Sequence, residues 1–139
     1  MSERPSPDAF PSRTHDKLRY NDTDRQGHVN NAVFSTFLET GRVEIFYRDP
    51  DVIREGCEFV IARCTLDFLS EIRWPGEVEI CSGVKRLGTS SVNLEQAIFQ
   101  DGEVVAHAET IIVQIDQQTR KSAPLSDKAR TKLETLMMA

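Results

Sequence analysis

Residues that could do chemistry gather in one short segment, "RYNDTDRQGHVNN" (19–31). It holds Asp22, Asp24 and His28, and it directly precedes residues with the apolar spacing of a helix. A helix N-terminus offers unpaired backbone N–H groups and about half a positive charge, which suits an oxygen that gains negative charge. A carboxylate held opposite those N–H groups could act on an electrophilic carbonyl. The segment therefore has the minimal set of groups for hydrolysing an activated ester.

Two other interpretations of this segment compete with catalysis. Asp22, Asp24 and Gln26 match the first three ligand positions of an EF-hand calcium loop, but the twelfth position, which must be glutamate, is Val33. The preceding residues are also strand-like rather than helical, so a calcium site is excluded. The segment could instead be purely structural, because Asp, Gly and Asn favour turns and either asparagine would cap the helix.

The residues after the segment predict a long amphipathic helix. Its apolar residues fall at i, i+3, i+4, i+7 and i+11 on one face: Phe34, Phe37, Leu38, Gly41 and Ile45. Glycine in a helix costs about 1 kcal/mol relative to alanine, so Gly41 predicts a close approach to something packed across the helix. Pro50 sets the end of the helix, because the residue before a proline is pushed out of the helical region.

Strands fill most of the remaining chain. Period-two alternation predicts a short strand at 14–20 and long strands at 60–68, 77–85, 92–98 and 104–116. The Asp-Gly pair at 101–102 is a strong hairpin signal. Ser126 is a favourable N-cap for a C-terminal helix with one apolar stripe: Leu133, Leu136 and Met137.

This order of elements predicts an α+β fold. A strand, a long helix, four strands in hairpin sequence and a terminal helix bury their apolar faces best if an antiparallel sheet curls around one long central helix. We expect a single domain at 14–139 after a flexible N-terminal tail, 1–13, which is rich in proline and serine. The opposite sheet face is also apolar, which favours self-association: Ile61, Phe99, Ile111, Val113 and Ile115.

Composition excludes several classes of function. The net charge of −5 gives no support for nucleic-acid binding, and no apolar run approaches the ~20 residues of a membrane span. The N-terminus lacks the apolar region of a signal peptide. Cys57, Cys64 and Cys81 are odd in number and lack C-x-x-C spacing, which indicates reduced thiols in a cytoplasm rather than disulfides or a zinc site. Cys64 is expected in the core.

The segment "YNDTDRQGHVNNAVFSTFLETGR" resembles the N-terminal motif of hotdog-fold acyl-CoA thioesterases of the 4-hydroxybenzoyl-CoA thioesterase type. The similarity continues through residues 86–125. The resemblance implies that Asp24 is catalytic and that the backbone amide of Asn31 polarises the thioester carbonyl. Aromatic-substrate members often carry a Tyr-containing segment where this chain has Asn30 and Asn31, which favours a fatty acyl group.

Other polar residues have both a functional and a structural interpretation. His28 either contacts substrate or water, or orders the loop. Glu39 and Arg42, spaced i, i+3, are expected to form a helix ion pair. Because other hotdog thioesterases carry a catalytic carboxylate on the central helix, Glu39 is the alternative if Asp24 is not the catalytic group.

Basic and hydroxyl residues near the second long hairpin are candidates for coenzyme A binding. Lys85 and Arg86 either contact its phosphates, as the resemblance implies, or form a solvated strand end. Ser90 and Ser91 belong to the same candidate CoA-binding region. Neither is a hydrolase nucleophile, because G-x-S-x-G is absent and "GTSS" joins two strands.

The residue patterns and the resemblance together predict a homodimer or dimer of dimers in the cytoplasm. It is expected to hydrolyse acyl-CoA without a metal or redox cofactor, coenzyme A being part of the substrate. The pantetheine arm would run between subunits toward Asp24. Asp24 would activate water or attack the carbonyl itself. The alternatives are a thioesterase acting on acyl carrier protein and a non-catalytic acyl-thioester-binding module.

Overall fold

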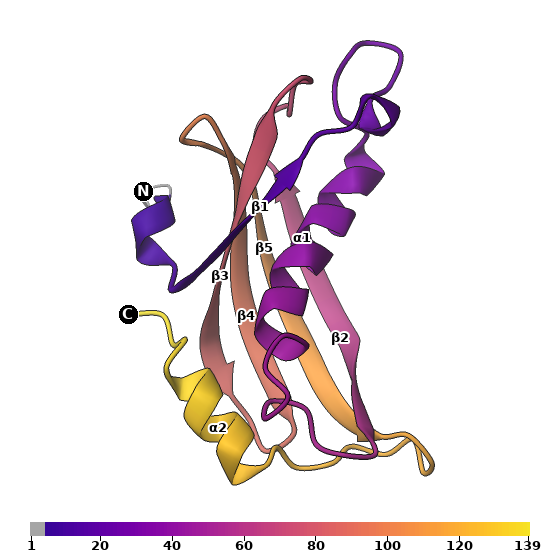
Figure 1. Cartoon of the computed structure of the whole chain (residues 1–139), viewed down its shortest axis with the longest axis vertical. Helices are drawn as coiled ribbons and strands as arrows, with labels where there is room; N and C mark the ends of the chain where they lie inside the picture. Colours follow the sequence, from indigo (N-terminus) through magenta and orange to yellow (C-terminus); the bar gives the residue numbers. More distant parts are fainter. Residues whose placement is uncertain (1–4) are drawn as a thin grey trace.

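The structure, a computed structural model, describes residues 5–139. One antiparallel sheet of five strands curls around a long helix, as predicted, and a short helix lies near the C-terminus (Figure 1). The elements in chain order are the 3-10 turn η1 (Pro7–Ala9), β1 (Ser12–Lys17), the 3-10 turn η2 (Tyr20–Asp22), α1 (Asn31–Phe46), β2 (Cys57–Phe68), β3 (Glu77–Leu87), β4 (Ser91–Gln100), β5 (Glu103–Asp116) and α2 (Asp127–Glu134).

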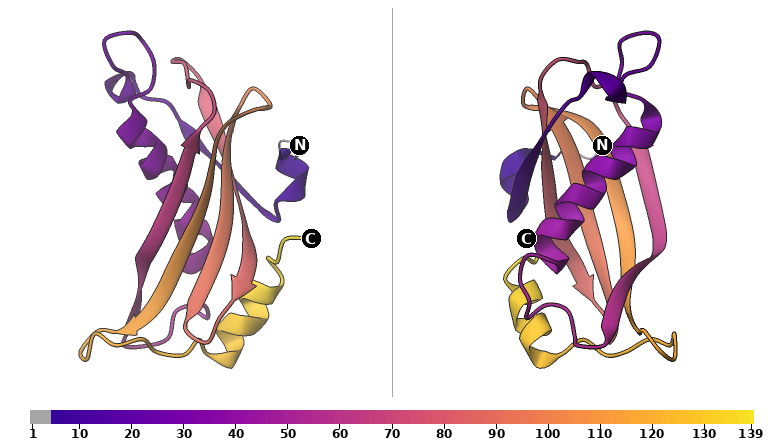
Figure 2. Two further views of the ribbon diagram at one scale, coloured as in Figure 1. Left: turned by 180° about the vertical axis from the view of Figure 1, so that it is seen from behind. Right: turned by 45° about the vertical axis from the view of Figure 1, so that its right-hand side comes forward.

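Helix α1 lies in the concave face of the sheet, where it packs against β1, β3 and β4 (Figure 2). All five predicted residues of its apolar face are buried. The close approach predicted at Gly41 is confirmed, because a Cβ at this position would lie 2.6 Å from the Ile80 side chain. Beneath the glycine, Gln96 donates hydrogen bonds to the Leu38 carbonyl (3.0 Å) and to Ser82 Oγ (2.9 Å).

The strand order is β1-β3-β4-β5-β2, so the prediction of four strands in simple hairpin sequence is wrong for β2. The β3–β4 and β4–β5 hairpins are present, and the Asp-Gly turn is confirmed with φ of 52° at Asp101 and 82° at Gly102. Strand β2 instead pairs with β5 at the far edge. Because α1 joins β1 to β2 across the concave face, these two strands lie on opposite edges. The connection 69–76 then crosses back over the end of the sheet.

A register shift between Ile61 and Arg63 reverses part of the predicted facing of β2. Ile61 therefore lies on the α1 side of the sheet and does not belong to the opposite apolar face. Cys64 is exposed, so its predicted place in the core is wrong. The reason is its position on the outermost strand, beyond the strands that α1 covers. On the opposite face, Phe99 packs against Phe10 of the N-terminal segment.

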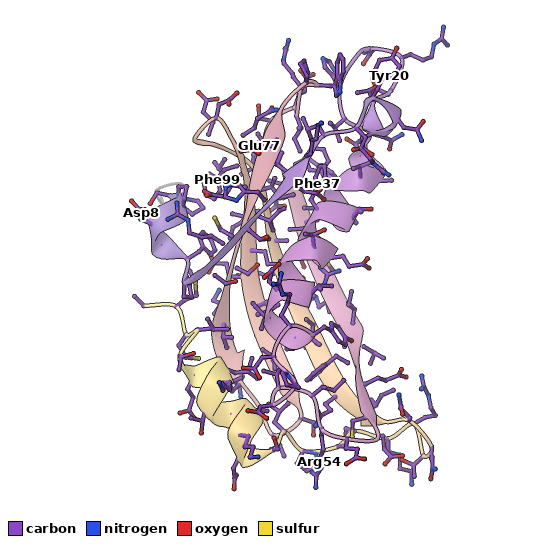
Figure 3. The ribbon with its side chains drawn as sticks, viewed as in Figure 1. Asp8, Tyr20, Phe37, Arg54, Glu77 and Phe99 are labelled. Carbon is purple, nitrogen blue, oxygen red and sulfur yellow. The ribbon has the colours of Figure 1, made fainter. Side chains whose placement is uncertain are left out.

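Ordered structure begins earlier in the chain than the predicted boundary at residue 13. Strand β1 covers Ser12–Lys17 rather than 14–20, and the residues after it form the turn η2. Phe10 is buried against the sheet. Figure 3 shows Asp8 in the N-terminal turn η1, at one side of the sheet. Residues 1–4 of the predicted tail lie outside the described residues.

Candidate active site

The loop before α1 is fixed by Asp22, which is buried. Its carboxylate accepts three hydrogen bonds from Arg19: one from the backbone N–H (2.9 Å), one from Nε (3.2 Å) and one from Nη2 (2.8 Å). Burial alone would raise the pKa of this carboxyl group, but the bonds from Arg19 outweigh it and hold the pKa below its usual value. The Asp22 carbonyl also accepts the Asn30 N–H at 2.8 Å. Asp22 is therefore a structural residue.

Asp24 is exposed, and its two carboxylate oxygens have different surroundings. Oδ1 accepts the backbone N–H groups of Gln26 (2.8 Å) and His28 (3.3 Å), which closes a turn around Gly27, whose φ is +80°. Oδ2 has no hydrogen-bond partner in the part of the chain that the structure describes. The turn role and a chemical role are therefore compatible, because each uses a different oxygen of the same side chain.

Helix α1 begins at Asn31, and of the two asparagines predicted as caps it is Asn30 that forms the N-cap. The Asn30 side chain accepts the Ala32 N–H at 2.9 Å, which satisfies one of the free donors of the first turn. The Asn31 N–H has no such partner among residues 5–139. It therefore remains available to an external acceptor, at the positive end of the helix dipole.

Asp24 and Asn31 line the same cavity, which has a volume of about 390 Å³. One wall comes from the loop and the start of α1, and the other from the end of β2 and the connection that follows it. Phe34 and Phe68 meet edge to face across these walls, with ring centroids 5.0 Å apart. The cavity thus joins a carboxylate, a free amide and an apolar wall. Its lining residues are Asp24, Gln26, His28, Val29, Asn31, Phe34, Phe68, Leu69, Ser70 and Glu71.

Comparison with known proteins identifies the family of this fold and site. The sequence model described as "Thioesterase-like superfamily" matches residues 18–133. The chain belongs to this superfamily. The fold is the predicted hotdog fold, and the predicted class of enzyme, a thioester hydrolase, is confirmed.

Individual members of the superfamily are similar over most of the chain. The long-chain acyl-CoA thioesterase FadM of Escherichia coli strain K12 is 28% identical over 130 residues, 90% of this chain and 98% of FadM. The acyl-CoA thioester hydrolase YbgC of Escherichia coli O6:H1 is 25% identical over 114 residues, 78% of this chain and 85% of YbgC. A thioesterase from Thermus thermophilus, solved in complex with coenzyme A and zinc, is 35% identical with a TM-score of 0.80, covering 91% of this chain and 93% of that one.

The second wall of the cavity that Asp24 lines carries a carboxylate that the sequence did not predict as a site residue. Glu71 Oε2 lies 3.2 Å from His28 Nε2, and Arg73 donates to the same oxygen at 3.3 Å. Backbone contacts hold this connection against the loop: the Val29 N–H donates to the Ile72 carbonyl at 2.8 Å. Nothing local distinguishes Glu71, because the contact depends on β2 crossing to the far edge of the sheet.

The residues predicted to bind coenzyme A do not line the cavity of Asp24 and Asn31. Ser90 lies in the β3–β4 turn and Ser91 is the first residue of β4. This turn is at the opposite end of the sheet from the start of α1 (Figure 1). Strand β3, 11 residues long, separates the two ends by about 35 Å. Lys85 donates to Glu109 at 2.6 Å, which raises the pKa of the lysine and lowers that of the glutamate. Arg86 is exposed and forms no ion pair with any described residue.

The predicted ion pair between Glu39 and Arg42 does not form. Arg42 is half-buried and donates to Gln96 Oε1 at 3.4 Å instead, and burial lowers the pKa of its guanidinium group. Both residues line a second cavity, of about 190 Å³, between α1 and β2. Glu39 therefore does not share the cavity of Asp24.

Two further observations concern the described residues as a whole. No three His, Cys, Asp or Glu side chains within residues 5–139 are grouped so that they could hold a metal ion. No helix in the same range is both long enough and apolar enough to cross a membrane.

Proposed function

We propose that this thioesterase hydrolyses acyl-CoA to a free acid and coenzyme A in the cavity at the N-terminus of α1. The observation that carries the proposal is the shared cavity of Asp24 and Asn31, with Oδ2 of the first and the N–H of the second both free of partners among the described residues. Asn31 would hold the thioester oxygen while Asp24 acts on the carbonyl carbon or on a water beside it. The names of FadM and YbgC support acyl-CoA as the substrate class.

In this mechanism the charge on the thioester oxygen grows as the carbonyl is attacked. A free N–H at a helix N-terminus stabilises that charge, and one such donor typically contributes about 2.7–4 kcal/mol to the transition state. If Asp24 is a general base, Oδ2 takes a proton from the attacking water. If it is a nucleophile, Oδ2 forms a mixed anhydride that water then cleaves. Both routes need the orientation that the turn imposes through Oδ1.

A fatty acyl group suits the apolar wall of the cavity. Phe34 is buried and Phe68 is 51% exposed, so their edge-to-face pair leaves apolar surface beside the site of attack. Burying this surface against an alkyl chain contributes about 25 cal/mol per Å². The polar side chains that line this cavity among the described residues are those of Asp24, Gln26, His28, Asn31, Ser70 and Glu71.

We further propose that a second copy of the chain completes the site. Arg86, Ser90 and Ser91 are too far from Asp24 to reach a CoA bound at their own protomer's cavity, so their predicted contact requires a partner. The outer edge of β2 supports this assembly. It is a 12-residue strand with no neighbour on one side among the described strands, and such an edge favours pairing with another copy across a two-fold axis.

The apolar surface beside this edge agrees with self-association. Val43, Tyr47 and Ile61 are 39%, 54% and 52% exposed, and all three line the cavity between α1 and β2. A monomer would leave them in water. This surface, rather than the opposite sheet face, is where we place the contact between subunits. Whether two or four copies assemble and whether the protein is cytoplasmic stay predictions.

Thiol release from a panel of acyl-CoAs tests the proposal. We expect purified protein to release coenzyme A, with faster turnover of long-chain substrates, and Asp24→Asn to lower kcat by at least ~100-fold. Asp51→Asn, at an exposed position after α1, is the matched control and should behave as wild type. Absence of thiol release would favour the non-catalytic binding module, and faster hydrolysis of acyl carrier protein thioesters would favour the other alternative.

A further inference from the structure

His28 and Glu71 line the same cavity as Asp24, with His28 on the loop that carries Asp24 and Glu71 on the facing connection after β2. His28 is held on two sides: its backbone carbonyl accepts the Asp24 N–H at 2.8 Å, and its Nε2 lies 3.2 Å from Glu71 Oε2. The ring also lines the cavity in which the thioester is proposed to bind. A carboxylate on one ring nitrogen fixes the orientation of an imidazole and leaves the other nitrogen for chemistry.

Glu71 reaches this position on a well-fixed backbone. The residue two places further on, Arg73, forms an isolated bridge with His28 across the loop. The Gln100 side chain forms two hydrogen bonds with the backbone of Arg73: its Oε1 accepts the Arg73 N–H at 3.0 Å, and its Nε2 donates to the Arg73 carbonyl at 2.8 Å. Ile72 between them is fully buried. These contacts fix the backbone beside Glu71, whose side chain is 53% exposed.

We propose that His28 is the general acid for the departing thiolate and that Glu71 is the residue that positions it. This inference rests on the proposed function, which assigns Asp24 but leaves the leaving group without a proton donor. A carboxylate bound to one ring nitrogen fixes the ring and leaves the other nitrogen to face a reacting group. His28, beside Glu71 and on the same loop as Asp24, is placed to give a ring proton to the departing sulfur.

The step balances without a further reactant. Water adds to the carbonyl carbon and gives one proton to Asp24. When the carbon–sulfur bond breaks, its electron pair stays on sulfur, and the sulfur takes a proton from the His28 ring. Asp24 then returns its proton to solvent and the ring takes one up. The products are the carboxylic acid and the thiol.

The test varies the acidity of the leaving thiol. An alkyl thiolate is basic and needs a proton as it leaves, whereas an aromatic thiolate leaves readily without one. Two acyl thioesters that both lack the CoA nucleotide are compared, one of N-acetylcysteamine and one of an aromatic thiol such as thionitrobenzoate. The variants are His28→Gln, Glu71→Gln and their combination. Glu103→Gln, at an exposed position in the β4–β5 hairpin, is the control.

On the alkyl thioester we expect kcat to fall by at least ~100-fold in His28→Gln and by at least ~10-fold in Glu71→Gln. The double variant should match His28→Gln alone, because Glu71 acts through the ring. On the aromatic thioester all three should approach wild type, as Glu103→Gln does on both. Equal losses on the two substrates, or none on either, would overturn the inference and leave the proposed function standing. No hydrolysis by wild type would overturn both.

Discussion

Replacing Asn31, the first residue of α1, by proline tests the contribution of its backbone amide alone. Asn31→Pro removes one N–H, and that N–H forms no bond within the described part of the protein. Asn30 has φ −59° and ψ 138°, which is the conformation that a residue before proline prefers. The Asn30 cap on Ala32 is untouched. Proline is favoured at the first helical position, so we expect unfolding free energy within about 1 kcal/mol of wild type.

The expected loss of activity is large by comparison. Removing one oxyanion donor typically costs ~100- to 1000-fold in kcat, or about 2.7–4 kcal/mol. Asn31→Ala keeps the amide and loses only an exposed side chain, so it should stay close to wild type. The assay is kcat for thiol release from a saturating acyl-CoA, with circular dichroism and thermal unfolding on both variants. If folded proline and alanine variants are equally active, the Asn31 amide is not the oxyanion donor and another group polarises the carbonyl.

Four further predictions address other parts of the molecule. Arg86→Ala should raise KM for acyl-CoA several-fold with little change in kcat, while Lys85→Ala does less because its ammonium group is held within the protomer; equal effects would contradict this division. Ile61→Lys should shift the assembly toward monomer in light scattering, and an unchanged mass would place the interface elsewhere. Gly41→Ala should lower the free energy of unfolding by about 1–3 kcal/mol in urea titration, because the added Cβ would overlap three side chains. Wild-type stability in this variant would mean that those side chains move aside at little cost. Because the folded state lowers the pKa of Asp22, the ionised carboxylate stabilises the fold at neutral pH, and this stabilisation is lost as pH falls below about 4. The difference in unfolding free energy between wild type and Asp22→Asn should therefore shrink below that pH.

Local features of this chain were readable from the sequence because neighbouring residues determine them. The apolar face of α1, the Asn30 cap and the turn at Gly102 each depend on spacing within a few residues. The motif that holds Asp24 was readable for the same reason, since its acceptor and donors lie within four residues. Gly41 predicted a close approach without saying which strand would make it.

The remaining features depend on where distant segments meet. The crossing of β2 to the far edge decides that Cys64 is exposed and that Glu71 faces His28. The register shift after Ile61 reverses the facing of half a strand, and no turn residue in the sequence marks it. Glu39 and Arg42 have the spacing of an ion pair, but Arg42 instead donates a hydrogen bond to the buried Gln96 of β4. Each of these outcomes is set by tertiary contacts rather than by local preference.

The two aspartates of the loop show how a residue that forms a turn can also be a candidate for catalysis. Asp22 is fully engaged by Arg19 and cannot meet a substrate without breaking the loop. Asp24 uses only Oδ1 for the turn. These bonds fix the carboxylate, and with it the orientation of Oδ2. Asp24→Asn keeps an oxygen to accept the Gln26 and His28 N–H groups, and it replaces the second oxygen by a group that can neither take a proton nor attack a carbonyl. A loss of activity in a folded Asp24→Asn protein therefore reports the chemistry of Oδ2, whereas Asp24→Ala would remove turn and chemistry together.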